Sequence, residues 1–291
     1  MVTNQDTAAV AVDIDDGGRW TSLRLAGREW LWSGPGLTDG PRTGLTAFVD
    51  AGGVDECFPT IRGTPDHGAL WNQPWHRTGA DTVSYGAATL TRTFTSVPDL
   101  VTVDYRLEAE PGYRFVWAAH ALVDCAAGAT ISAPWGTRSR LYPEAADLLR
   151  DAWPPGAPWV TEPWPTQLDL TTYGPTDGTA VGAVLLDCPT ISVRDRGAEL
   201  TMTLSCPEQP TSTALWRNQG GFPADAPYRS LGVEPMLGRV FDLAEAGPGD
   251  AAVVPASGEL TWQLTLTAKP IQWNQASMPA LIGRPTATAI T

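Results

Sequence analysis

The chain has 291 residues, of which 43% are hydrophobic and 18% charged, so it can fold around a large core. Its net charge is -13, and only one of its 19 basic residues, Lys269, is a lysine. This charge repels nucleic acid and anionic membranes and disfavours a highly anionic substrate. We therefore expect neither a nucleic-acid partner nor a membrane partner.

The N-terminal residues, MVTNQDTAAVAVD, lack the basic and apolar segments of a signal peptide, and no apolar run is long enough for a membrane span. Four cysteines lie far apart, without a CxxC pair. This pattern predicts reduced thiols in a cytoplasmic protein, because disulfide frameworks and structural zinc sites need other cysteine patterns.

Alternation of apolar and polar residues at period two recurs along the chain and predicts β-strands. In chain order, these runs are 21–32, 88–97, 100–110, 130–135, 167–174, 191–206 and 259–268. Thr, Val, Trp and Tyr are frequent in the runs, and clusters of Gly, Pro, Asp and Asn separate them. A helix is predicted only at 143–152, PEAADLLRDA, which begins with proline and has apolar residues at helical spacing.

Many short strands without a break in composition predict an all-β fold. We expect one large antiparallel β-sandwich, forming a single domain over residues 1–291, with at most one or two short helices. The sequence shows neither an internal repeat nor a linker. The Pro-rich stretch 154–165 contains tryptophans, which favour a packed loop over a linker.

The segment 53–75, GVDECFPTIRGTPDHGALWNQPW, places ionisable and aromatic side chains among glycines and prolines. Such a segment is typical of an irregular loop, and loops often carry functional residues, so we expect a pocket wall here. His67 lies on a turn and is free to face the pocket. Asp55 and Glu56 are adjacent and point opposite ways on extended backbone, so at most one of them faces a given pocket.

Two further ionisable residues lie in apolar runs. His120, in RFVWAAHALVDC, fits either a core histidine or a functional one. Glu234, in SLGVEPML, is a lone carboxylate that is costly to bury without a role, which indicates a general base; an exposed edge-strand glutamate is the alternative. No nucleotide-binding motif, HExxH or nucleophile elbow is present, and no ligand spacing is visible, so we expect no metal.

Thirteen tryptophans are an unusually high number for a chain of this length. Trp71, Trp75, Trp135 and Trp216 lie beside Gly, Pro, Asn or Arg instead of inside alternating strands. A flat apolar ring with polar neighbours suits the C–H face and the hydroxyls of a sugar. Much of the remaining tryptophan is expected to be ordinary core.

Four segments occur in the order GGVDECFPTI, PDHGALWNQPW, FVWAAHALVD and LGVEPMLGRVFDLAEA. Together they resemble the aldose 1-epimerase (galactose mutarotase-like) superfamily, over nearly the whole chain. The resemblance implies a large antiparallel β-sandwich that interconverts the α and β anomers of a free aldose without a cofactor. It also implies that Glu234 removes the anomeric hydroxyl proton, that His120 protonates the ring oxygen, and that His67 binds that oxygen.

The sequence departs from the pattern of galactose mutarotases at two places. Ala121, Leu122 and Val123 follow the strand histidine, where proline and aromatic residues are usual, and residues 60–63 replace an Asn-Arg pair. The identity of the sugar is therefore left open. Arginines are few near the motifs, which favours a neutral sugar over a sugar phosphate.

The expected site thus combines catalytic and substrate-binding residues. The catalytic residues are His120, Glu234 and His67, and the sugar contacts are Arg62, one of Asp55 and Glu56, Trp71 or Trp75, and Trp216. Two alternatives remain, a carbohydrate-binding protein without catalysis and another carbohydrate isomerase or lyase on the same fold. A pure binding protein needs no acid–base pair, so His120 and Glu234 disfavour it. The sequence leaves open the oligomeric state and which of His67 and His120 is the proton donor.

Overall fold

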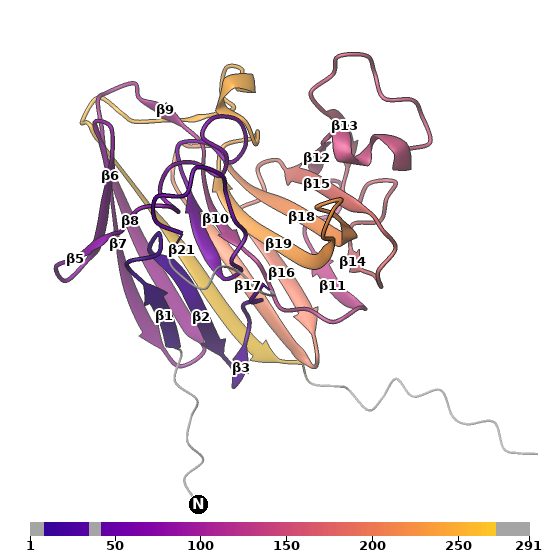
Figure 1. Cartoon of the computed structure of the whole chain (residues 1–291), viewed down its shortest axis with the longest axis horizontal. Helices are drawn as coiled ribbons and strands as arrows, with labels where there is room; N and C mark the ends of the chain where they lie inside the picture. The colour runs from indigo at the N-terminus through magenta and orange to yellow at the C-terminus, as the bar shows by residue number, and fades with distance from the viewer. Residues whose placement is uncertain (1–8, 35–41, 272–291) are drawn as a thin grey trace, which may run out of the picture.

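A computed structural model gives the structure of the protein and describes residues 9–34 and 42–271. Two large antiparallel sheets pack face to face, which confirms the predicted all-β sandwich (Figure 1). The ends of the predicted single domain, and part of the segment examined for a signal peptide, lie outside the described residues. Within those residues no helix is long and apolar enough to cross a membrane. All four cysteines are free thiols.

The first sheet has ten strands and follows the order β1-β2-β4-β10-β19-β18-β15-β12-β13, with β3 beside β2. Its strands are β1 (Ala9–Asp13), β2 (Arg19–Leu25), β3 (Arg28–Glu29), β4 (Val54–Cys57), β10 (Trp117–Ala121), β12 (Arg138–Leu141), β13 (Val160–Pro163), β15 (Ala180–Leu185), β18 (Thr211–Phe222) and β19 (Tyr228–Leu237). Strands β18 and β19 form a long hairpin at its centre.

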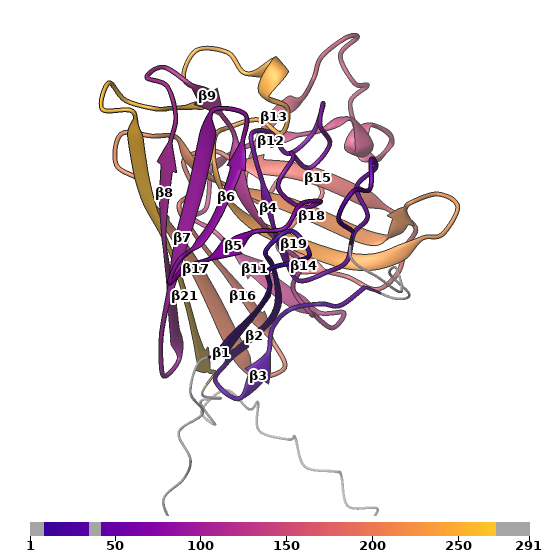
Figure 2. The same cartoon turned by 60° about the vertical axis from the view of Figure 1, so that its left-hand side comes forward.

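The second sheet has nine strands in the order β14-β11-β16-β17-β21-β8-β7-β6-β5. Its strands are β5 (His76–Arg77), β6 (Asp81–Tyr85), β7 (Ala88–Val97), β8 (Leu100–Glu108), β11 (Ala129–Ser132), β14 (Thr172–Tyr173), β16 (Thr190–Asp195), β17 (Ala198–Ser205) and β21 (Glu259–Pro270). In Figure 2, β7, β8 and β21 stand at the left, while β15, β18 and β19 of the first sheet extend to the right. Strands β9 (Arg114–Phe115) and β20 (Ala252–Val253) form a small separate sheet.

The main core lies between the two large sheets. Alternation sends every second side chain of each strand inward; in β21, for example, Leu264 is buried while Gln263 is exposed. Tyr105 and Trp262 stack at 5.2 Å between ring centroids, and Trp117 meets Trp262 edge-on at the same distance. Several tryptophans are therefore core residues, as expected from composition.

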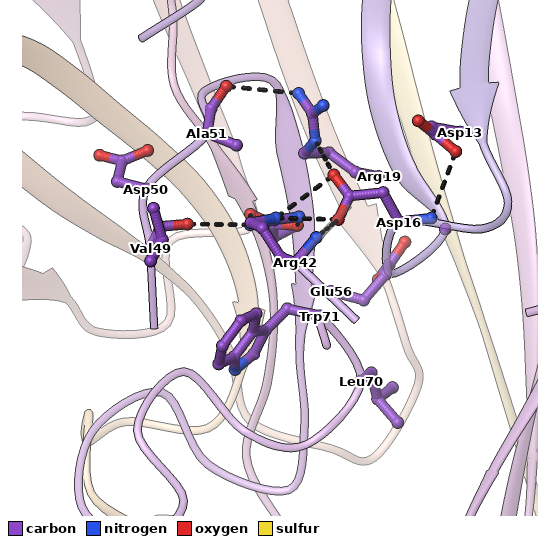
Figure 3. A network of polar contacts seen from close by, with 12 residues as sticks. Asp13, Asp16, Arg19, Arg42, Val49, Asp50, Ala51, Glu56, Leu70 and Trp71 are labelled. Atoms are coloured by element: carbon purple, nitrogen blue, oxygen red, sulfur yellow. Dashed lines mark hydrogen bonds and ion pairs between the residues drawn. The ribbon is translucent and has the colours of Figure 1, made fainter. Parts of the chain in front are cut away.

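Two fully buried arginines stabilise the packing of loops and strands around this core. Arg92 forms an ion pair with Glu56 at 2.6 Å and contacts Asp81 at 3.4 Å. Arg42 binds Asp55 at 2.7 Å and Asp16 at 3.2 Å, and it also donates to the carbonyl of Val49 at 3.0 Å. Figure 3 shows Arg42 between Asp16 and Val49, so one guanidinium fixes the path of the loop that follows it.

The predicted helix at 143–152 is shorter and tighter than expected. The chain forms a 3-10 helix, η1 (Pro143–Leu148), and becomes extended at Leu149. A second 3-10 helix, η2 (Leu243–Glu245), is capped by the side chain of Asp242. The predicted strand at 167–174 is mostly turn, and only β14 pairs there, because Thr166 and Asp169 adopt positive φ angles that end an extended chain.

The outer face of the ten-stranded sheet carries a second, smaller hydrophobic cluster. Cys57, Ala118 and Met236 lie in register on three neighbouring strands, Ala214 and Val184 lie in register on the next two, and all five share this cluster. Loop residues that include Ile61 and Phe241 cover it. The same face, a short way along these strands, holds the candidate site.

Candidate active site

His120 and Glu234 lie opposite each other on the neighbouring strands β10 and β19. Ala118 pairs with Met236 and Leu122 bridges Gly232, and the register between these pairs sets His120 across from Glu234. Side chains two residues apart on a strand share a face, so both point to the outer face of the sheet. His120 Nδ1 and Glu234 Oε1 are 3.1 Å apart.

The His120–Glu234 pair is almost inaccessible to solvent, with exposed fractions of 6% and 2%. Burial lowers the pKa of His120, but the charge and contact of Glu234, followed by Asp50 and Asp55, outweigh it and raise that pKa to about 9. His120 is therefore protonated at neutral pH. Glu234 Oε2 is buried and has no hydrogen-bond partner among the described residues, which is costly unless a ligand supplies a donor.

An NMR titration of the histidines should show His120 titrating near pH 9. Glu234→Gln removes the negative charge that raises the pKa of His120 most, so this pKa should fall, because burial still lowers it and only the smaller effects of Asp50 and Asp55 raise it. Because the folded pKa is the higher one, the stability that this pair contributes is complete below pH 6.5 and is lost as the pH rises through 9. A pKa near 6.5 in the unchanged protein would contradict the ion pair.

His67 reaches the same place from the loop that follows β4. Its ring lies 5.1 Å from that of His120, edge-on, and Phe48 stacks on it in parallel at 3.6 Å. The backbone φ of His67 is 56°, a left-handed conformation that is uncommon for a residue other than glycine. A hydrogen bond from its N–H to the carbonyl of Ile61, 2.8 Å long, holds this turn. Such strain at a pocket residue supports a functional position.

These side chains line a cavity of about 540 Å³, which is in the range of small-molecule sites. Arg62, on its opposite side, binds Glu144 at 2.7 Å and lies over the ring of Phe241. Trp216 forms part of the cavity wall between these two polar regions. The structure thus brings together His120, Glu234, His67, Arg62 and Trp216 from the residues that the sequence suggested.

The sequence suggested that one of Asp55 and Glu56 contacts sugar hydroxyls, but the structure places both of them elsewhere. Asp55 is on the pocket side of the sheet, but both of its oxygens accept hydrogen bonds from Arg42. Glu56 points into the core between the sheets, where Arg92, Tyr105 and Trp117 donate to it. Neither acid lines the cavity, so both are assigned to internal ion pairs instead.

Trp71 and Trp75 are also buried and lie outside the cavity wall. Trp75 packs over the guanidinium of Arg92 at 4.2 Å, inside the core. Trp71 donates to the carbonyl of Asp66 and meets Phe48 edge-on, so it supports the ring that stacks on His67. Their expected stacking on a sugar is therefore replaced by packing roles.

Sequence reasoning missed several residues of the cavity wall. Some lie on loops whose path only the fold reveals, and others are polar residues of unremarkable sequence context; they are Phe48, Asp50, Glu144, Phe222, Tyr228 and Phe241. Asp50 accepts a hydrogen bond of 2.6 Å from the Tyr228 hydroxyl. No three His, Cys, Asp or Glu residues are arranged as metal ligands within the described ranges.

Gly232 leaves the space that the carboxylate of Glu234 occupies. A Cβ at this position would lie 2.5 Å from Glu234 Oε1 and 3.0 Å from Trp216 Cβ. The φ of Gly232 is outside the positive range, so the backbone itself accepts an alanine. Glycine is therefore needed at position 232 to make room for the Glu234 carboxylate, and not because of the backbone conformation of the strand.

Gly232→Ala should move the Glu234 carboxylate away from His120 and so lower the pKa of His120, while the protein stays folded. The clash meets the flexible end of the Glu234 side chain, which can turn away. Alanine is preferred over glycine in a strand by about 0.5–1 kcal/mol, which offsets the strain. Chemical denaturation and an NMR titration of His120 on the same preparation check both parts. An unchanged pKa of His120 would show that Glu234 needs no such space.

Neither a protein-family model nor a curated protein matches the chain. Its structure is similar to the Slr1438 protein from Synechocystis sp. PCC 6803, at a TM-score of 0.68 and 15% identity, with 92% of this chain and 94% of that chain covered. It is also similar to a candidate aldose 1-epimerase from Escherichia coli K12 (TM-score 0.63, 15% identity, 91% and 98% covered).

A third similar structure is a galactose mutarotase-like protein from Lactobacillus casei, at a TM-score of 0.57 and 14% identity, with 92% and 99% covered. These identities are low, and the likeness is one of architecture along nearly the full length of each chain. The chain therefore has the galactose mutarotase-like, or aldose 1-epimerase, fold.

Proposed function

We propose that the protein interconverts the α and β anomers of a free, neutral aldose by general acid–base catalysis. The observation that carries this proposal is the buried pair of His120 and Glu234, 3.1 Å apart at the wall of the cavity. A protonated imidazole and a carboxylate with an unpartnered oxygen are a proton donor and a proton acceptor side by side. The fold, which is shared with proteins described as mutarotase-like, supports the same reaction.

Glu234 starts the reaction by accepting the proton of the anomeric hydroxyl. The electron pair of that O–H bond forms the C1=O1 carbonyl, the bond between C1 and the ring oxygen breaks, and the ring oxygen takes a proton from the imidazolium of His120. After rotation about C1–C2, the ring hydroxyl attacks the other face of the carbonyl. Closure returns one proton to His120 and one to O1, so the catalyst is regenerated. Each such group contributes about 10²–10⁴ in rate.

His67, Arg62 and Trp216 are proposed to hold the sugar. His67 lies beside His120 and can bind the ring oxygen while the acid acts on it. The guanidinium of Arg62 presents donors to hydroxyls from the far side of the cavity. The half-buried ring of Trp216 offers a face for the C–H groups of the sugar.

A neutral aldose should be preferred to its 6-phosphate. The described wall of the cavity holds four carboxylates, Asp50, Asp66, Glu144 and Glu234, against the single arginine Arg62, which Glu144 already pairs. Other candidate phosphate ligands are engaged away from it; Arg140, for example, binds Asp250. Competition between glucose or galactose and the matching 6-phosphates checks this. A tenfold preference for the phosphate in kcat/KM would contradict the charge argument.

The direct test of the proposed function uses freshly dissolved α anomers of a panel of aldoses. Polarimetry should show that the protein accelerates their relaxation to the equilibrium mixture. Binding of a sugar without any acceleration would instead support the carbohydrate-binding alternative. Because spontaneous mutarotation proceeds in water, the same buffer without protein supplies the baseline.

A further inference from the structure

The cavity extends along β19 well beyond the acid–base pair. Glu234 lines one end, and Tyr228, six residues earlier on the same strand, also lines it. At the usual rise of a strand the Cα atoms of these two residues are about 20 Å apart, but their side chains approach more closely, because Asp50, which binds the Tyr228 hydroxyl, still raises the pKa of His120. A single pyranose ring placed against Glu234 and His120 leaves the cavity wall at Tyr228 and Phe222 uncovered.

The extra length is lined by aromatic rings of the β18–β19 hairpin. Trp216 and Phe222 meet edge-on with centroids 5.7 Å apart, and Phe222 pairs across the hairpin with Tyr228. Phe222 is 50% exposed, whereas most large apolar side chains of the described chain are buried. A large aromatic side chain left half-exposed on a cavity wall marks a surface for an apolar ligand face.

The tip of this hairpin is held in one conformation by Asn218, which is fully buried. Its Oδ1 accepts hydrogen bonds from the N–H groups of Gly220, Gly221 and Phe222, and its Nδ2 donates to the Phe222 carbonyl at 2.7 Å. These contacts satisfy the backbone of the bulge that presents Phe222. The exposed ring therefore has a preorganised position, which lowers the entropic cost of binding against it.

Polar groups at the same end can bind hydroxyls. Asp50 lines the cavity and accepts from the Tyr228 hydroxyl at 2.6 Å and from the Gly52 N–H at 3.0 Å. A carboxylate has about four acceptor sites, so two further donors can be bound. Aromatic faces with a carboxylate beside them form a suitable surface for a second sugar ring.

We propose that Phe222 and Asp50, beyond Trp216, form a second sugar-ring subsite, so that the substrate is a reducing disaccharide or a longer reducing oligosaccharide. The proposal rests on the proposed function, which requires a free anomeric hydroxyl at Glu234. The reducing ring therefore occupies the His120–Glu234 end, and the next ring lies toward Phe222. A glycoside substituted at its anomeric oxygen has no proton for Glu234 and is not a substrate.

The experiment measures anomer exchange by NMR for one aldose and for disaccharides carrying that aldose at the reducing end, with α and β 1→4 and 1→6 linkages. We expect kcat/KM for the best disaccharide to exceed that of the monosaccharide about tenfold, which corresponds to about 1.4 kcal/mol of additional binding free energy. Phe222→Ala should reduce this ratio to near one. Trp135→Ala removes an aromatic that is 83% exposed and away from the cavity, and it should leave the ratio unchanged.

Equal kcat/KM values for monosaccharide and disaccharide, with no change of their ratio in Phe222→Ala, would overturn the subsite and leave the proposed function intact. If no sugar is interconverted, the proposed function fails, and calorimetry then decides on the subsite. Disaccharide binding that weakens about tenfold in Phe222→Ala, but not in Trp135→Ala, would support it. Binding that is equal in all three proteins would overturn it.

Discussion

Replacing Glu234 by glutamine should lower turnover by about two to four orders of magnitude. The amide keeps the shape of the side chain opposite His120, but it cannot accept the anomeric proton. It also removes the charge that keeps His120 protonated, so donor and acceptor are lost together. His120→Ala should cause a loss of similar size, and combining the two changes should cost little more than either alone, because they act as a unit.

The matched control is Glu108→Gln, which makes the same chemical change at an exposed position at the end of β8. It should leave turnover unaffected. Circular dichroism and denaturation must show that Glu234→Gln is folded, so that lost activity is not lost structure. Turnover near that of the unchanged protein in either Glu234→Gln or His120→Ala would refute the role assigned to that residue.

Arg92→Met should lower the free energy of unfolding by about 3–5 kcal/mol, because it leaves a buried carboxylate without its counter-charge. Arg92 and Glu56 are both fully buried, 2.6 Å apart. Arg106→Met is the control, since Arg106 forms exposed ion pairs, which contribute little to stability, so this change should leave the free energy of unfolding nearly unchanged. Urea denaturation measures the free energy of unfolding of both variants, and the values are comparable if the dependence of that free energy on urea concentration has the same slope as in the unchanged protein.

The Arg92–Glu56 ion pair also allows a test of whether Glu56 is a core residue, as in the structure, or a sugar contact, as the sequence suggested. Glu56→Gln combined with Arg92→Met should recover part of the lost stability, because no unpaired charge remains and the amide oxygen can still accept from Tyr105 or Trp117. As Glu56 lies away from the cavity, Glu56→Gln alone should leave KM unchanged. A large rise of KM without loss of stability would restore Glu56 as a sugar contact.

Strands were predictable because alternation is a local signal. The run at 88–97 coincides with β7, and the run at 191–206 matches the hairpin of β16 and β17 except for Thr190. The helix at 143–152 was overestimated because its composition favours a helix, while the chain turns extended at Leu149 ahead of Pro154. The short β14 shows the same limit for strands, since turn residues overrode the alternation at 167–171.

The candidate site was predictable only in part, because its geometry depends on strand register. His120 and Glu234 are far apart in sequence, and their contact follows from the pairing of β10 with β19. The opposite directions of Asp55 and Glu56 were predictable, but the face that holds the cavity was not. One signal was present, because Glu56 shares its face with Val54, which favours the core. Phe48 and Asp50 had no such signal, since the path of their loop depends on Arg42.

The most direct test of the central claim follows a reducing sugar in D₂O by NMR with catalytic amounts of the protein. Saturation transfer between the two anomeric signals reports ring opening, and the signal of the proton on C2 reports removal of a carbon-bound proton in the same sample. Acid–base catalysis by His120 and Glu234 at the anomeric centre predicts faster exchange between anomers with the C2 proton fully retained. Absence of faster exchange, or loss of the C2 signal to deuterium as an isomerase would cause, would contradict it.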